Sequence, residues 1–194
     1  MRSQLWWYVA RSGGIVAWVL LGLSMLWGLA LSTRALGPKP RPNWLLDMHR
    51  YLGGLALIFT GLHVAGLVAD SYTHFGPTEV LVPFTGTWHP VAVAWGVIAM
   101  YLLAAVELTS LARKRLSKRA WRMTHMLSFP LFVFSTAHGL SAGTDRNTFL
   151  LKASMIAGSI AVAIATFVRV RGIERPDTQQ RTPRPSRMSP PTPV

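Results

Sequence analysis

Five long stretches without acidic or basic residues dominate this chain of 194 residues. They lie between residues 11 and 34, 50 and 70, 79 and 107, 122 and 145, and 147 and 168, the last interrupted by Lys152. A helix needs roughly 20 apolar residues to cross the hydrocarbon core of a bilayer. Only 14% of the residues are charged and 51% are hydrophobic, which is unlike a soluble domain of this size. The pattern predicts an all-α integral membrane bundle with five transmembrane helices, at residues 13–33, 45–70, 89–112, 120–141 and 148–169.

The positive charges separate onto the two sides of such a bundle. One side receives Arg34, Lys39, Arg41, Arg50, Arg113, Lys114, Arg115, Lys118, Arg119, Arg122, Arg169, Arg171, Arg175, Arg181, Arg184 and Arg187. The other receives Arg2, Arg11, Arg146 and Lys152. Cytoplasmic loops carry the excess of Lys and Arg in membrane proteins. We therefore expect the N-terminus outside, the C-terminus in the cytoplasm and a multi-pass location in the plasma membrane, where the net charge of +13 meets lipid rather than nucleic acid.

Three segments are expected along the chain: an N-terminal segment at 1–12, the membrane domain at 13–170, and a basic, proline-rich, disordered cytoplasmic tail at 171–194. Cleavage of a signal peptide near Ala30 would leave four spans. A retained first helix explains the cations after it more simply. The absence of cysteine excludes thiolate ligation and covalent attachment of haem through a C-x-x-C-H motif.

Four of the six histidines form two matched pairs. His49 and His63 are fourteen residues apart on the second expected span, and His125 and His138 are thirteen apart on the fourth. At 1.5 Å per residue both separations are about 20 Å, and the two spans run in the same direction. His49 is therefore level with His125 near the inner face, and His63 with His138 nearer the outer face. This geometry suits a bis-imidazole haem at each level.

An ideal helix does not place His125 and His138 on one face, because thirteen residues miss the starting face by about 140°. The fourth span must bend, and Pro130 supplies a cause by removing a backbone hydrogen bond. Five small residues near the ligands are expected to let a macrocycle approach the backbone: Gly53, Gly54, Gly61, Gly66 and Gly139.

Other polar residues have weaker assignments. Arg50 and Arg122 flank the inner ligands at a depth that suits haem propionates, and Arg146 and Lys152 are candidates for the outer haem. The alternative for all four is a role in topology and lipid contact. His74 and His89 in the outer loop are expected to be ordinary surface residues, with a metal site beside Asp70 or Glu79 as the other possibility.

The segments DMHRYLGGLALIFTGLH and THMLSFPLFVFSTAH, separated by one span, resemble the transmembrane domain shared by ferric reductases, NADPH oxidases and the haem-binding subunit of periplasmic methionine sulfoxide reductases. The resemblance covers about residues 45–170. It implies two b-type haems, the inner bound by His49 and His125 and the outer by His63 and His138. Family members usually have a further N-terminal helix, and the eukaryotic enzymes continue into a flavin and nicotinamide domain. No such domain, and no G-x-G-x-x-G motif after a strand, is expected here.

The expected function is that of an electron-transfer subunit without its own flavin domain. Electrons would enter from a separate cytoplasmic flavoprotein or a membrane quinol and leave to ferric iron or an external oxidoreductase. The basic turn at 113–122 would dock an inner donor. Two alternatives stay open: a self-sufficient, quinol-dependent ferric reductase, and a non-haem membrane scaffold or transporter in which the histidines pack or carry protons.

Overall fold

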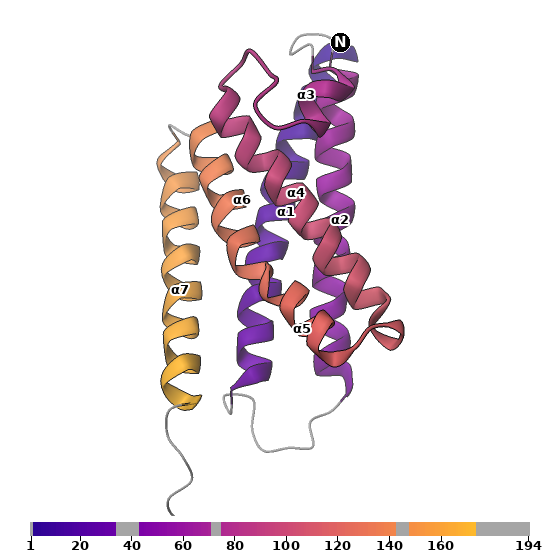
Figure 1. Ribbon diagram of the computed structural model, residues 1–194. Helices are drawn as coiled ribbons and strands as arrows, with labels where there is room; N and C mark the ends of the chain where they lie inside the picture. Colours follow the sequence, from indigo (N-terminus) through magenta and orange to yellow (C-terminus); the bar gives the residue numbers. More distant parts are fainter. Residues whose placement is uncertain (1, 34–42, 71–74, 143–147, 174–194) are drawn as a thin grey trace, which may run out of the picture.

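Long apolar helices, packed side by side, form the structure, a computed structural model that describes residues 2–33, 43–70, 75–142 and 148–173 (Figure 1). All regular elements in these residues are helical: α1 (Arg2–Ser32), α2 (Asn43–Ala69), α3 (Pro77–Leu81), α4 (Pro90–Leu111), the 3₁₀ turn η1 (Arg113–Arg115), α5 (Lys118–Met126), α6 (Ser128–Ala142) and α7 (Phe149–Ile173). Four of them, α1, α2, α4 and α7, are long and apolar enough to cross a membrane. The predicted all-helical membrane class is confirmed.

The expected fourth span, 120–141, is divided into α5 and α6 at Leu127. Pro130 lies in the first turn of α6, where its missing N–H would otherwise point toward Met126, the last residue of α5. The Leu127 N–H donates instead to the carbonyl of Thr124, 3.0 Å away, which closes α5 with a tighter turn. The predicted bend near Pro130 is confirmed, and neither piece alone has the length of a span.

Two other boundaries differ from expectation. Residues 2–12, expected as a separate N-terminal segment, form the first turns of α1. Aromatic and apolar residues on the N-terminal side of Arg11 extend the helix in that direction. The segment between α2 and α4 contains the short helix α3, which begins at Pro77 as its first residue. The expected disordered tail falls almost wholly outside the described residues, as do His74 and Arg146.

The core lies where α1, α4 and α6 meet in the middle of the bundle. Its buried side chains are Leu21, Met25, Leu29, Ala56, Ala99, Leu103, Leu131, Phe132 and Val162. Trp18 of α1 stacks on Phe132 with ring centroids 6.0 Å apart, and its Nε1–H donates to Thr136 Oγ1 at 2.9 Å. These contacts hold α1 against α6, so the first helix lies inside the assembly rather than at its edge.

Small residues bring α1 and α2 together. A Cβ placed on Gly66 would lie 2.7 Å from the backbone nitrogen of Ala10, and one on Gly13 would lie 3.1 Å from that of His63. Such close backbone approach through small residues is the usual packing mode of membrane helices. Large apolar side chains such as Leu23, Ile58 and Ile164 remain exposed on the outer faces of the helices, as expected for surfaces that face lipid.

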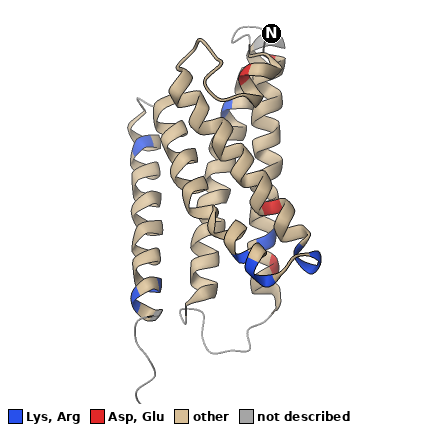
Figure 2. Ribbon diagram, in the orientation of Figure 1, with Lys and Arg blue, Asp and Glu red and all other residues tan. Residues whose placement is uncertain are grey.

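Basic residues gather at the end of the bundle that carries α5, as Figure 2 shows. They come from α2, η1, α5 and the last turn of α7: Arg50, Arg113, Lys114, Arg115, Lys118, Arg119, Arg122, Arg169 and Arg171. The opposite end, which carries α3, includes Arg11 and Lys152. We call these the α5 end and the α3 end.

Candidate haem sites

The structure brings the four histidines of the two ligand segments together as two facing pairs. His63 of α2 and His138 of α6 have ring centroids 6.2 Å apart, with the ring planes at 75°. His49 of α2 and His125 of α5 have centroids 5.9 Å apart, with the planes at 81°. The first pair lies toward the α3 end and the second toward the α5 end. The pairing by level that the sequence predicted is the pairing that the structure shows.

These separations match two imidazoles that bind one metal ion from opposite sides. A ring nitrogen binds a transition metal at about 2.0 Å, which sets the two ring centroids roughly 6 Å apart. Among the described residues no group of three or more His, Cys, Asp or Glu could hold a bare ion. Each pair offers two axial ligands only, which suits a macrocycle that brings four nitrogens of its own. The residues present therefore fit haem.

Three of the imidazoles are held in one tautomer. His63 Nδ1 lies 2.6 Å from the carbonyl oxygen of Ala10, and His138 Nδ1 lies 2.8 Å from that of Ala92. His49 Nδ1 lies 3.1 Å from the carbonyl oxygen of Ser24 and 3.2 Å from the Ser24 hydroxyl. A carbonyl oxygen can only accept, so Nδ1–H donates in each case. The neutral ring then keeps its lone pair on Nε2. A hydrogen bond of this kind orients a metal-binding histidine and raises its basicity.

His125 is held differently. Its Nδ1 is buried and has no hydrogen-bond partner among the described residues. The ring stacks instead on Trp121, with centroids 5.1 Å apart and planes at 20°. The guanidinium of Arg113 covers the indole of Trp121 at 4.5 Å. Stacking thus restrains the tilt of His125 without fixing its tautomer.

A cavity of about 590 Å³ lies beside the pair at the α3 end. His63 and His138 are part of its wall, together with apolar residues of α1, α2, α4, α6 and α7. Trp18, Val97 and Met155 are among them. A volume of this order, mostly apolar with a few polar groups, is typical of cofactor sites.

The residues expected to meet haem propionates lie in different settings. Arg50 NH1 pairs with Asp47 Oδ1 at 3.3 Å, and both side chains are more than half exposed. Arg122 and Lys152 are also exposed, and Lys152 is not part of the wall of the cavity at the α3 end. Arg11 of α1 does line that cavity. The sequence analysis missed it, although it lies one turn before Gly14 on a helix face that turns toward the histidines.

Four of the five glycines expected beside the macrocycle do not line the cavity next to His63 and His138. A Cβ on Gly54 or Gly61 would meet nothing within 4 Å, Gly53 faces the carboxylate of Glu107, and Gly66 faces the backbone of Ala10. Gly139 alone among the five lines the cavity at the α3 end. A Cβ placed on Gly139 would meet the side chain of Met155.

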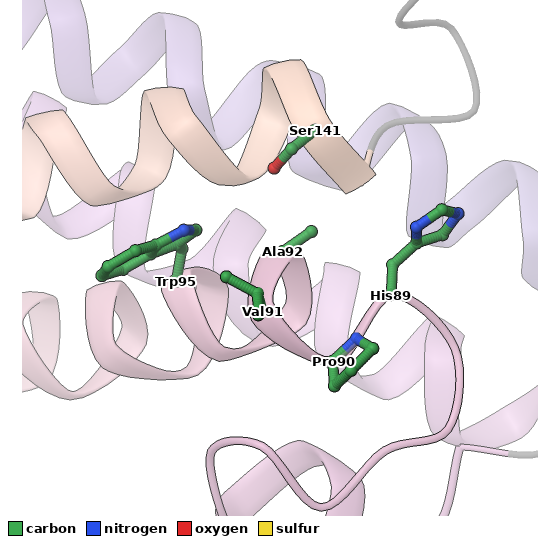
Figure 3. Close-up of a pocket in the computed structure, with 6 residues that line it drawn as sticks. All are labelled: His89, Pro90, Val91, Ala92, Trp95 and Ser141. Atoms are coloured by element: carbon green, nitrogen blue, oxygen red, sulfur yellow. The ribbon is translucent and has the colours of Figure 1, made fainter.

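His89 lies apart from both pairs. It precedes α4 with a left-handed backbone (φ 42°) and packs edge-on against Trp88, with ring centroids 4.7 Å apart. A second cavity of about 450 Å³ separates it from Ser141 of α6, as Figure 3 shows. No described acidic residue joins it in a metal-binding group.

Comparison with known proteins places this arrangement in a family. A family model described as "Ferric reductase like transmembrane component" matches residues 12–136. The match begins in α1, well before the segment on which the resemblance rested, and it contains His49, His63 and His125. It ends two residues before His138. No curated protein and no solved structure matches the chain. The match covers well over half of the 194 residues, and the protein belongs to the ferric reductase like transmembrane family.

Proposed function

We propose that this protein is a di-haem b-type cytochrome that carries electrons across the plasma membrane. The observation that carries the proposal is the presence of two facing histidine pairs, with ring centroids 6.2 and 5.9 Å apart, at two levels of one helical bundle. His63 and His138 hold the outer haem, and His49 and His125 the inner. The fourteen residues from His49 to His63 separate the levels by about 21 Å along α2. Two haems at these levels bridge most of a hydrocarbon core about 30 Å thick.

When bound, haem would supply reversible one-electron chemistry at each level. The chain's own residues bind and orient it. The carbonyls of Ala10, Ala92 and Ser24 accept the Nδ1–H of three ligands, which leaves the Nε2 lone pair of each ring for the iron. The cavity beside the outer pair is lined mostly by apolar residues, which disfavour water. Arg11 provides a cation for a carboxylate at the α3 end of the cavity.

The distribution of charge supports a bundle with five spans, the N-terminus outside and the α5 end in the cytoplasm. The nine basic residues of the α5 end belong inside by the charge rule. α5 and α6 follow one another along α4, and together they connect the α5 end with the α3 end (Figure 1). The broken helix thus serves as the fourth span.

The α5 end also favours an acidic electron donor. Arg115, Lys118 and Arg119 are exposed there. They lie just before or at the start of α5, the helix that carries His125. Complementary charge would guide a cytoplasmic flavoprotein to the inner haem. A membrane quinol is the alternative to a flavoprotein as electron donor. The electron acceptor at the α3 end is ferric iron or an external oxidoreductase.

The test is an absorbance spectrum of the protein purified from haem-replete cells, with haem counted per chain. We expect the low-spin spectrum of bis-histidine haem at two haems per chain. His63→Ala and His138→Ala should each remove the outer haem and keep most of the inner one, and His49→Ala and His125→Ala should do the reverse. His89→Ala is the matched control, because His89 is a described histidine outside both pairs. A colourless wild-type preparation would refute the proposal, and loss of the same haem in all four variants would refute the pairing.

A further inference from the structure

The three hydrogen-bonded histidines share one local arrangement, repeated on two different helices. In each case Nδ1–H reaches the carbonyl of a residue in a neighbouring helix, and a glycine stands four residues further along that helix. His63 has Ala10 and Gly14, His49 has Ser24 and Gly28, and His138 has Ala92 and Gly96.

The spacing of four has a physical cause. In an α-helix the carbonyl of residue i accepts the N–H of residue i+4, so the side chain of residue i+4 stands beside that oxygen. A Cβ on Gly14 would lie 2.9 Å from His63 Nδ1, and one on Gly96 would lie 2.7 Å from His138 Nδ1. A Cβ on Gly28 would lie 3.0 Å from His49 Cε1. A Cβ at position 14 or 96 would force the imidazole to shift, and a Cβ at position 28 would press tightly against its imidazole.

We propose that Gly14, Gly28 and Gly96 are positioning residues for the haem ligands. The inference rests on the proposed function and deepens it. Each glycine opens one carbonyl of an intact helix to a second donor, and the histidine enters the space that a Cβ would fill. The bonded ring keeps its proton on Nδ1 and offers Nε2 to the iron, with its basicity raised.

The fourth ligand, His125, has no such arrangement of carbonyl and glycine among the described residues. Nδ1 of His125 is left without a partner among the described residues. The outer pair therefore has two hydrogen-bonded ligands and the inner pair has one.

The test replaces each glycine by alanine in the full chain and measures haem per chain and the midpoint potential of each haem. Gly14→Ala and Gly96→Ala should remove the outer haem or raise its potential, because a weaker Nδ1–H bond makes the ligand less basic. Gly28→Ala should do the same to the inner haem. In each variant the haem at the other level reports that the bundle has folded.

Three other glycine-to-alanine variants are matched controls. Gly54→Ala and Gly61→Ala place a Cβ in open space on α2, and Gly22→Ala on α1 makes only an ordinary contact at 3.6 Å. All six changes favour the helix to a similar degree. The controls should retain both haems with unchanged potentials.

The outcomes separate this proposal from the one on which it rests. Wild-type protein with two haems, and variants at 14, 28 and 96 with both haems unshifted, would overturn the positioning role and leave the cytochrome intact. Aggregation of these three variants with loss of both haems would also overturn the positioning role, since the glycines would then serve general packing. Wild-type protein without haem would overturn the cytochrome itself.

Discussion

Replacing Pro130 by alanine tests whether the bend between α5 and α6 is needed for the inner haem. Alanine restores an N–H that can donate to the carbonyl of Met126, so that α5 and α6 can join as one helix. In a straight helix His125 and His138 would point about 140° apart. Both could then not face the ligands of α2 at the same time.

The magnitude follows from the cost of proline within a helix. Proline disfavours a helix interior by about 3 kcal/mol, so its removal favours the straight form by up to that amount. At 1.4 kcal/mol for each factor of ten, the affinity for one haem should fall by up to about 100-fold. The inner haem is the one affected, because His138 is hydrogen-bonded to α4 whereas His125 has no such bond among the described residues.

The assay is the rate and extent of haem transfer from the purified protein to an excess of apomyoglobin, with the two haems distinguished by potential. Pro90→Ala is the matched control, since Pro90 is the first residue of α4, where a missing N–H costs nothing. The reasoning would be refuted if the Pro130→Ala variant transferred its inner haem no faster than the wild-type protein. Loss of the outer haem before the inner one would refute it as well.

Three further predictions concern ring orientation and charge. Ring planes at 75° and 81° predict highly anisotropic low-spin signals in electron paramagnetic resonance, and rhombic signals from both haems would contradict the geometry. Arg11→Gln should weaken retention of the outer haem about tenfold through loss of a charge-assisted bond, while Lys152→Gln should leave it unchanged, as haem-transfer measurements can show. Arg119→Glu should slow reduction by an acidic flavoprotein in stopped-flow experiments, and the difference from wild type should shrink at high salt.

The histidine pairs were open to prediction because helix geometry converts sequence spacing into height. Apolar length identified four helices that are long enough to cross a membrane, α1, α2, α4 and α7. The intervals of fourteen and thirteen residues gave two nearly equal separations. The bend at Pro130 followed from the mismatch between thirteen residues and the helical period. These inferences use only distances within one helix, so they need no knowledge of how the helices pack.

Contacts between helices were harder to predict, since apolar helices carry little sign of which face meets protein and which meets lipid. Gly54 and Gly61 lie beside the ligands in sequence but face open space. Arg11 lies far from the ligands in sequence but lines the cavity at the α3 end. Proximity along the chain was therefore a poor guide to the cation and the small residues around the site, and only the packing of α1 against α2 and α6 revealed them.

One signal for that packing was nevertheless present in the sequence. Gly14 and Gly28 are fourteen residues apart, the same interval that separates His49 from His63. Two antiparallel helices with equal intervals can bring both glycines opposite both histidines in a single register, and the contacts of Gly14 with His63 and of Gly28 with His49 show this register. The first helix contains no histidine, yet its spacing matches that of the ligands it supports. The equal interval of glycines and histidines therefore indicates the register in which α1 packs against α2.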